Sequence, residues 1–258
     1  MDIKNSTILI TGGTSGIGLE MVKQLSALGA ADIIITGRDA GKLLHIKTEL
    51  PHIHTFQSDV SKPEDIEKLC TLVTEQFPNL NMIINNAGIM RNLDLRDRNM
   101  SLEDITSEID INLVGTIRIV HQFLPHLLNR RSALIVNVSS GLAFIPFPVS
   151  PIYSAAKAGV HAYTQVLRLQ LKETNVRVIE LAPPATDTSL GDPFEGLVDS
   201  SVNMKTDKLV RLAIKGIVNG TSEIKPGLAK VLKAMSRIAP NTTLKMLDSS
   251  IQNAKAKL

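Results

Sequence analysis

The chain has 258 residues, of which 43% are hydrophobic and 21% charged, proportions that are ordinary for a globular protein. Its net charge of +3, with both signs interspersed and only 3% aromatic residues, argues against a nucleic-acid-binding protein. A single cysteine, Cys70, excludes an internal disulfide, and its apolar surroundings predict a buried thiol. No run is long enough to span a membrane, and the first residues lack a signal-peptide pattern. We therefore expect a cytoplasmic protein without stable membrane insertion.

Short runs rich in β-branched residues alternate with longer helical patterns along the chain. Because the strand candidates are almost continuously apolar and helices separate them, they predict a parallel sheet covered on both faces. The fold expected for residues 1–258 is a single α/β domain with a doubly wound sheet of six or seven strands. Strands are predicted at 6–11, 32–36, 53–59, 81–86, 133–139 and 176–182, and helices at 16–29, 39–49, 62–77, 102–129 and 152–174.

In such a sheet, ligands bind beyond the carboxyl ends of the strands, so the residues that follow each strand are the functional candidates. The first strand is followed by TGGTSGIG, which opens the first helix. Glycines let the backbone approach a pyrophosphate, and the helix N-terminus favours its negative charge. The P-loop ending Gly-Lys-Ser/Thr is absent here. The candidate cofactor-binding residues of this loop are Gly12, Thr14, Ser15, Gly16, Ile17 and Gly18.

After the second strand, the sequence TGRDA places Arg38 where a site that prefers NAD normally has an acidic residue. A guanidinium can hold a ribose 2′-phosphate as a charged fork, and the hydroxyls of Thr14 and Ser15 are within plausible reach. Asp39 is one residue further on and fits a helix N-cap. The sequence therefore favours NADP(H) over NAD(H).

The later strand ends also carry candidate residues. Asp59 and Val60 follow the third strand and could meet an adenine, although Asp59 could equally satisfy loop amides. The fifth strand ends in Ser139 and Ser140, and the next helix begins with Tyr153 four residues before Lys157. Residues at i and i+4 share a helix face, and a nearby ammonium makes a phenol easier to ionise. Asn86, Ala87 and Gly88, after the fourth strand, are small or amide-bearing and permit close approach of a cofactor.

These motifs together resemble the short-chain dehydrogenase/reductase superfamily, whose sheet is of the Rossmann type. The matching segments are TGGTSGIG, NNAG, INLVG, NVSS and YSAAK, which occur in the family's order and cover residues 6 to about 190. The resemblance implies that Tyr153 is the general acid and that Ser140 binds the carbonyl oxygen. It also implies that Lys157 lowers the pKa of Tyr153 and binds the nicotinamide ribose, and that Asn112 holds a water that relays protons to Lys157.

Two segments depart from the family pattern. The loop LAPPATDT has Pro184 in place of the usual glycine, which removes a backbone donor, while Thr188 falls at the position that meets the nicotinamide. Pro183 and Thr186 belong to the same expected cofactor contact. Residues 220–258 form a divergent, basic C-terminal segment, and this segment with the Pro-Pro pair resembles the DltE-like subgroup.

The substrate side is expected in the loops after the later strands. The segment GLAFIPFPVSP is apolar, and a mobile lid is expected at about 187–215. Arg91, Arg96 and Arg98 could meet an acidic substrate, but a solvated loop fits them better. No histidine spacing indicates a metal site, so none is assigned. The substrate-binding candidates are Ser140, Leu142, Phe144, Tyr153 and Pro184.

The function expected from these residues is NADP(H)-dependent interconversion of a carbonyl and an alcohol on an apolar small molecule. An NADPH-binding sensor or scaffold without turnover is the alternative, although a pure binder has no need for all four residues Asn112, Ser140, Tyr153 and Lys157. The long helices 102–129 and 152–174 have broad apolar faces, which in the family form the core of a homodimer or homotetramer.

Overall fold

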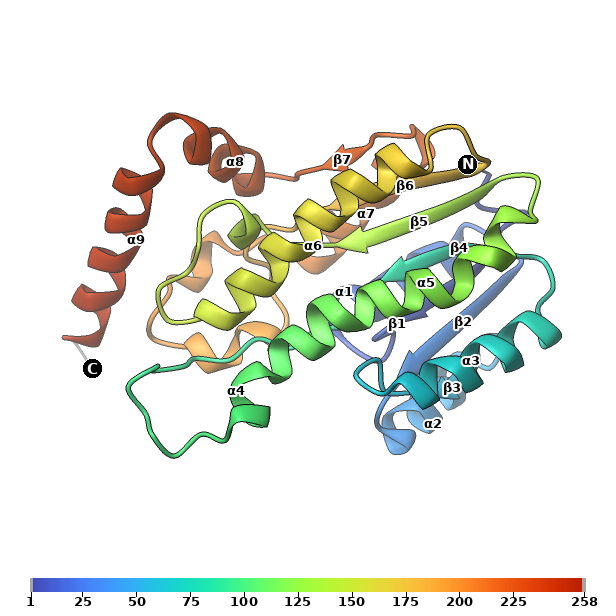
Figure 1. Cartoon of the computed structure of the whole chain (residues 1–258), viewed down its shortest axis with the longest axis horizontal. Coiled ribbons are helices and arrows are strands. Elements are labelled where there is room, and N and C mark those ends of the chain that lie inside the picture. Colours follow the sequence, from blue (N-terminus) through green and yellow to red (C-terminus); the bar gives the residue numbers. More distant parts are fainter. Residues whose placement is uncertain (1, 257–258) are drawn as a thin grey trace.

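A computed structural model describes residues 2–256, and its centre is a seven-stranded parallel sheet. The strands lie in the order β3-β2-β1-β4-β5-β6-β7, so the chain winds outward from β1 in both directions (Figure 1). The doubly wound fold is thereby confirmed. The strands are β1 (Thr7–Thr11), β2 (Asp32–Gly37), β3 (His54–Gln57), β4 (Leu80–Asn85), β5 (Ala133–Val138), β6 (Val176–Leu181) and β7 (Glu223–Ile224).

Helices cover both faces of the sheet, as the apolar strands require. The helices are α1 (Gly16–Ala27), α2 (Ala40–Glu49), α3 (Pro63–Gln76), α4 (Leu102–Ile109), α5 (Gly115–Leu128), α6 (Pro151–Gln170), α7 (Thr206–Val218), α8 (Leu228–Ile238) and α9 (Pro240–Lys255).

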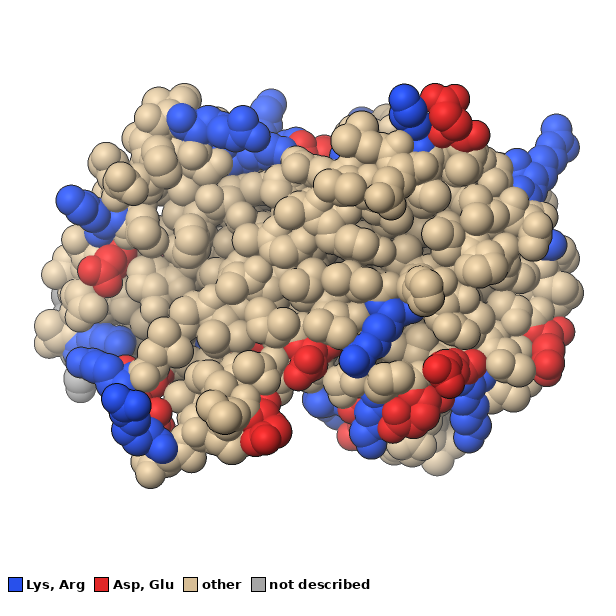
Figure 2. All heavy atoms as spheres, in the orientation of Figure 1, with Lys and Arg blue, Asp and Glu red and all other residues tan. Residues whose placement is uncertain are grey.

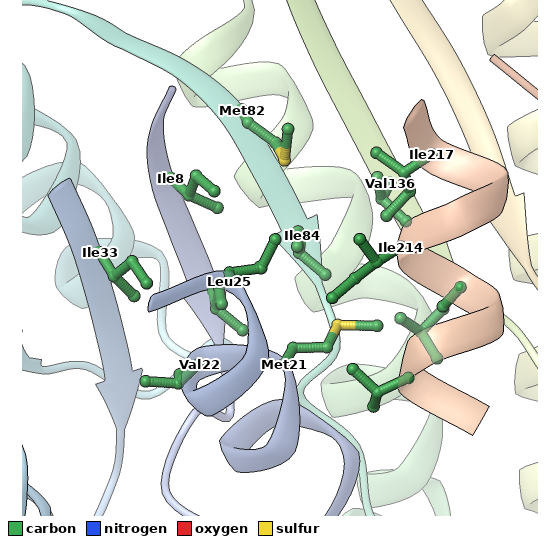
Figure 3. Packing of buried hydrophobic residues seen from close by; sticks show 14 of the residues in the cluster. Ile8, Met21, Val22, Leu25, Ile33, Met82, Ile84, Val136, Ile214 and Ile217 are labelled. Atoms are coloured by element: carbon green, nitrogen blue, oxygen red, sulfur yellow. The ribbon is translucent and has the colours of Figure 1, made fainter. Parts of the chain in front are cut away.

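Two apolar cores lie on opposite faces of the sheet. On one face, α1, α2 and α7 pack against the strands, and Met21 and Ile214 meet the side chains of Ile84 and Val136 (Figure 3). On the other face, α3, α5 and α6 form a second core around Phe123, where Cys70 is buried as expected. Aliphatic side chains build most of both cores. This packing holds the sheet rigid, so the strand ends can position the site.

The predicted helix 102–129 is interrupted. Residues Asp110–Val114 form a π-helical turn between α4 and α5, and Asn112 lies in this turn. A π turn displaces the backbone from the regular ladder of hydrogen bonds, and such turns occur frequently at functional sites. The hydroxyl of Thr116 donates to the carbonyl of Asn112 at 2.9 Å, a buried hydrogen bond between the turn and α5.

The C-terminal part differs most from the sequence expectation. Only residues 187–205 of the predicted lid are loop, with two short 3-10 turns, because Thr206 begins α7. Val210 and Ala213 of α7 are fully buried in the first core. Beyond the two-residue strand β7, α8 and α9 form a pair of helices at one end of the sheet (Figure 1). The predicted segment 220–258 thus ends in two helices, and its residues 257–258 lie outside the described part. No helix of residues 2–256 has the length and apolarity needed to cross a membrane.

Candidate active site

The glycine-rich loop lies where the chain reverses its direction of winding, because β1 pairs with both β2 and β4. Gly12 has a positive φ of 66°, and a Cβ there would lie 2.9 Å from the Cα of Ala87. Ser15 caps α1 in an extended conformation without using its side chain, and the first turn of α1 has no acidic residue. The backbone amides and the hydroxyl of Ser15 are therefore available to an anion.

Asn86 connects the end of β4 to this loop. Its Nδ2 donates to the carbonyls of Thr11 and Gly12, both at 3.1 Å. The backbone amides of Asn86 and Ala87 in turn donate to the hydroxyl of Thr11, at 3.0 and 3.1 Å. A Cβ on Gly18 would lie 2.5 Å from Asn86 Nδ2. Asn86 therefore positions the glycine-rich loop, and its side-chain amide donates its hydrogen bonds to that loop.

Arg38 and Asp39 have different environments after β2. Asp39 is the N-cap of α2, and its Oδ1 accepts a 3.0 Å hydrogen bond from the backbone amide of Lys42. Arg38 is exposed, and within residues 2–256 its guanidinium has neither a hydrogen bond nor an ion pair. A Cβ on Gly37 would lie 3.1 Å from the side chain of Thr14. The hydroxyl of Thr14 and the segment that carries Arg38 therefore adjoin.

Asp59 satisfies its own loop, the alternative considered from sequence. Its Oδ1 accepts hydrogen bonds from the amide and hydroxyl of Ser61, at 3.0 and 2.7 Å. Val60 is buried, and a Cβ on Gly115 would lie 2.9 Å from its carbonyl. The glycine that follows the π turn lets the start of α5 approach this loop. Contact of Asp59 and Val60 with an adenine stays a prediction.

Tyr153, Lys157 and Ser140 converge beyond β5. Tyr153 and Lys157 lie one turn apart on α6, and Lys157 Nζ is 5.6 Å from the centre of the Tyr153 ring. Lys157 Nζ donates a 2.8 Å hydrogen bond to the carbonyl of Val138, the last residue of β5. Ser140 Oγ accepts from the amide of Leu142 at 3.1 Å and is in hydrogen-bond contact with the Tyr153 phenol. The helix and the strand end together place a hydroxyl, a phenol and an amine at one point.

The electrostatics of this group differ from the expectation that Lys157 makes Tyr153 easier to ionise. Burial raises the pKa of Tyr153 to about 12, although the hydrogen bond with Ser140 lowers it. The negative charge of Glu108 raises it further. Burial also lowers the pKa of Lys157 to about 8, because the protein interior disfavours its charge. Burial is the largest cause of the raised pKa of Tyr153, so Tyr153 is a protonated acid at neutral pH.

Asn112 is fully buried, and both ends of its amide are occupied. Its Oδ1 accepts from the amide of Ile89 and its Nδ2 donates to the carbonyl of Ile89, both at 2.9 Å. A Cβ on Gly88 would lie 3.0 Å from Asn112 Oδ1 and 3.6 Å from Lys157 Nζ, so only glycine leaves this space. Asn112 anchors the NNAG segment beside Lys157, and its proton-relay role stays a prediction.

The loop after β6 reaches the glycine-rich loop. A Cβ on Gly16 would lie 3.4 Å from the side chain of Thr188. Pro184 is buried, and its carbonyl accepts a 2.8 Å hydrogen bond from the Thr186 hydroxyl. The carbonyl of Pro183 accepts from the amide of Gly141 at 2.8 Å, which connects this loop to the Ser140 segment. The loop with two prolines therefore borders both halves of the site.

The apolar side chains predicted on the substrate side, Leu142 and Phe144, pack in two different places, and their contact with a substrate stays a prediction. Leu142 packs against a cluster of buried residues from the loop after β5, the lid and α9. Phe144 instead faces His161, with ring centroids 5.0 Å apart, and lies beneath Lys233 Nζ. Sequence reasoning missed the contributions of Met90, Ile251 and Ala254, since nothing in the chain order links α9 to the site. The substrate-side cluster comprises Met90, Leu142, Phe147, Val149, Phe194, Leu197, Ile251 and Ala254.

One histidine and two glutamates, His161, Glu180 and Glu223, meet next to Ser139. Their spacing in the sequence does not predict this cluster. Glu180 is fully buried and binds the Ser139 hydroxyl at 2.5 Å and His161 Nδ1 at 2.8 Å. Glu223 lies 4.0 Å from the same imidazole and pairs with Lys225 and Lys233. These three potential metal ligands come from α6, β6 and β7. The carboxylate of Glu180 already accepts from the Ser139 hydroxyl, and that of Glu223 pairs with Lys225 and Lys233. Because Lys233 belongs to α8, these ion pairs link α8 to the sheet.

Two of the three arginines after NNAG are paired with acidic residues. Arg91 Nη1 donates to both carboxylate oxygens of Asp104 at 2.9 Å. Arg96 forms a bidentate contact with Asp94, which holds the pKa of that carboxyl well below its usual range. Arg98 is exposed. Paired arginines make weak anchors for an acidic substrate, which agrees with the loop interpretation.

Comparison with known proteins decides the family. The family described as short chain dehydrogenase matches residues 6–195. The chain belongs to this family of oxidoreductases. It is 40% identical over 227 residues to the uncharacterized oxidoreductase DltE of Bacillus subtilis, which covers 87% of this chain and 89% of that protein. An uncharacterized oxidoreductase of Staphylococcus epidermidis is 32% identical over 189 residues, 73% of this chain and 81% of its own. The resemblance to the DltE-like subgroup is confirmed.

Solved structures of short-chain dehydrogenases share the fold. One from Burkholderia cenocepacia, in complex with NADP, has a TM-score of 0.83 at 22% identity and covers 96% of this chain and 99% of its own. One from Burkholderia phymatum, in complex with NAD, has a TM-score of 0.79 at 21% identity and covers 90% and 94%. The open cradle at Gly12 and the unused hydroxyl of Ser15 fit such a dinucleotide.

Proposed function

We propose that this protein is an NADP(H)-dependent oxidoreductase that interconverts a carbonyl and an alcohol on an apolar small molecule. The observation that carries the proposal is the convergence of Ser140, Tyr153 and Lys157 at the end of β5, beside the glycine-rich loop of a dinucleotide cradle. The end of β5 and the helix α6 that follows it bring these three groups together. The family membership supports the same reaction class.

The cofactor, when bound, supplies or accepts the hydride, so the protein must bind the carbonyl oxygen and provide one proton. Tyr153 is protonated at neutral pH and can donate its phenolic proton to the oxygen as negative charge develops there. The Ser140 hydroxyl is the second donor toward the same oxygen. Lys157 is anchored to Val138, which fixes the position of its amine beside Tyr153.

The environment of Arg38 supports a preference for NADP(H). Its guanidinium is exposed and unpaired within residues 2–256, next to the hydroxyl of Thr14. Asp39, the nearest acidic residue that could bind a ribose 2′-hydroxyl, uses its carboxylate to cap α2. A 2′-phosphate would therefore meet a cation and hydroxyls, whereas a bare ribose would lack its usual acidic partner.

The substrate-side cluster supports an apolar substrate. Phe147 and Phe194 pack with ring centroids 5.5 Å apart, and Ile251 of α9 is buried against the same group. Carboxylates already occupy Arg91 and Arg96 nearby. An uncharged aldehyde or ketone with an apolar body fits this wall better than a polyanion does.

We also propose that the protein is a homo-oligomer that associates through α5 and α6. The face above these helices carries few charged side chains (Figure 2). Val166 and Leu169 of α6 are 53% and 67% exposed, and Ile117 of α5 is 36% exposed. An apolar face of two long neighbouring helices is typical of a surface that a partner covers.

The experiment that tests the reaction measures NADPH oxidation by the purified protein over a panel of aldehydes, ketones and quinones, with NADH beside it. Tyr153→Phe is expected to lose at least ~100-fold in rate while NADPH binding stays within about twofold, because only the proton is removed. Tyr163→Phe, on the same helix, is the matched control. A Tyr153→Phe variant as fast as the wild type would remove Tyr153 from the mechanism. Tight NADPH binding without turnover on any compound would favour the sensor alternative.

A further inference from the structure

Glu108 is a fully buried carboxyl group close to the catalytic residues. It lies in the last turn of α4, one helical turn before Asn112, and has 0% exposure. Glutamate is almost never fully buried unless it is paired. In the proposed reaction, Glu108 has no direct role.

Among residues 2–256, Arg91 is the cation that pairs with Glu108, and it is shared with another acid. Glu108 Oε1 accepts a 2.9 Å hydrogen bond from the backbone amide of Arg91, and Oε2 lies 3.6 Å from Arg91 Nε. Neither Oε2 nor Nε has a hydrogen-bond partner within residues 2–256. The other end of the guanidinium binds the carboxylate of Asp104 and also its carbonyl. The negative charge of Glu108 is therefore only partly compensated.

Glu108 and Asn112 hold alternate residues of one extended segment. Asn112 binds both backbone groups of Ile89, and Glu108 binds the amide of Arg91 two residues later. The opposite side of this segment is bound to the loop before α6. The Ser150 hydroxyl donates to the carbonyl of Arg91 at 2.9 Å, and the amide of Leu93 donates to Val149 at 2.9 Å.

Ser150 is the N-cap residue of α6, three residues before Tyr153. Residues 89–93 therefore connect the helix that carries Glu108 and Asn112 to the helix that carries Tyr153. The helices α4 and α6 also contact each other directly. A change at Glu108 can reach Tyr153 through backbone contacts and through its charge.

We propose, on the basis of the function proposed above, that Glu108 is a positioning residue for catalysis: its buried carboxylate holds residues 89–93 between α4 and α6 and acts on Tyr153 through this connection and through its charge. Burial and Asp104 raise the pKa of Glu108, and the contacts with Arg91 lower it. The charge of Glu108 in turn raises the pKa of Tyr153, in the same direction as burial does. Arg91, Asp104 and Tyr153 are the charged and titratable groups that face it.

The test uses Glu108→Gln in the full-length protein. Glutamine has almost the same shape and can still accept the hydrogen bond from the Arg91 amide, but it has no charge. In carbonyl reduction, the rate falls as pH rises through the pKa of the general acid. Removing a negative charge makes Tyr153 easier to ionise, so this alkaline limb is expected to move to lower pH. Glu103→Gln, an exposed acid on the same helix, is the control and is expected to leave the limb unchanged.

A second readout does not depend on turnover. The chain has two tyrosines and no tryptophan, so in a Tyr163→Phe background the ultraviolet absorbance of tyrosinate reports Tyr153 alone. Glu108→Gln is expected to make this absorbance rise at lower pH, with circular dichroism confirming that the protein is folded at each point. Superimposable titrations and rate profiles for Glu108→Gln and the parent would overturn the charge role. If the parent protein has no reductase activity, the titration still tests Glu108 and the proposed function fails separately.

Discussion

Lys157 Nζ lies 2.8 Å from the carbonyl of Val138, so the helix α6 is tied directly to the end of β5. Lys157 is 4% exposed, and burial lowers the pKa of its amine from 10.5 to about 8. The folded protein therefore disfavours the charged form of Lys157, where the proposed reaction takes place. This lowered pKa predicts a specific dependence of stability on pH.

Lys157→Met is expected to change the pH dependence of stability. Because the folded-state pKa is depressed, protonated Lys157 destabilises the folded protein fully below pH 8, and this effect fades as pH rises toward 10.5. The free energy of unfolding of the variant minus that of the wild type should fall by about 3 kcal/mol between pH 7 and 10.5. Denaturant titrations of the cofactor-free protein measure it, and Lys215→Met, at an exposed lysine of α7, is the control. If the difference in the free energy of unfolding did not vary with pH, the lowered pKa of Lys157 would be contradicted.

Arg38→Ser should reduce the preference for NADPH. A charge-assisted contact to the 2′-phosphate contributes about 1.5–3 kcal/mol, so kcat/KM for NADPH should fall roughly 10- to 100-fold. The value for NADH should change by less than about twofold. Steady-state kinetics with both cofactors measure the ratio, and Arg131→Ser, at an exposed arginine two residues before β5, is the control. Equal losses for both cofactors would show that Arg38 does not read the phosphate.

Asp39→Ala should act on stability and leave cofactor preference unchanged. Its carboxylate caps α2 through Lys42, so its loss should lower the free energy of unfolding by about 1 kcal/mol. Asp39→Ser keeps a capping oxygen and should recover most of that loss. Thermal unfolding and the NADPH/NADH ratio of kcat/KM measure the two effects. A selective loss of NADH turnover in Asp39→Ala would instead indicate contact with the ribose.

Gly12→Ala should disrupt the cofactor cradle. The new Cβ would lie 2.9 Å from the Cα of Ala87, and the positive φ of Gly12 disfavours any side chain. NADPH affinity should fall by at least about tenfold, because the loop must move away from the end of β4. Gly191→Ala is the matched control, since a Cβ there meets nothing within 4 Å. Fluorescence titration of NADPH measures both variants, and unchanged affinity in Gly12→Ala would remove this loop from the cofactor site.

Leu169→Glu should weaken self-association. Leu169 is 67% exposed on the α6 face, where a buried charge would oppose contact with a second copy. Light scattering after size exclusion should show a lower average mass for this variant than for the wild type. Leu44→Glu places the same charge on α2, at a leucine that is 69% exposed, and should leave the mass unchanged. A wild-type protein that is already monomeric would reject the oligomer proposal.

The sequence by itself determined the element order, the parallel sheet and much of the site. Apolar strands that alternate with helices are compatible with few folds other than a parallel sheet covered on both faces. In such a sheet, the residues that follow each strand lie together at the carboxyl edge. Helical spacing likewise brought Tyr153 and Lys157 to one face of α6. Local patterns sufficed for these features because the chemistry lies in short contiguous motifs.

Only the tertiary structure decided the features that depend on contacts between distant segments. Glu108 meets Arg91 across 17 residues of chain, and the cluster of His161, Glu180 and Glu223 draws on three separate elements. The depth of burial of Tyr153 reversed the sign of its expected pKa shift, because desolvation depends on everything packed around a group. The packing of Ile251 against the substrate-side cluster likewise follows from where α9 comes to rest, and the order of residues along the chain does not encode that contact in any local pattern.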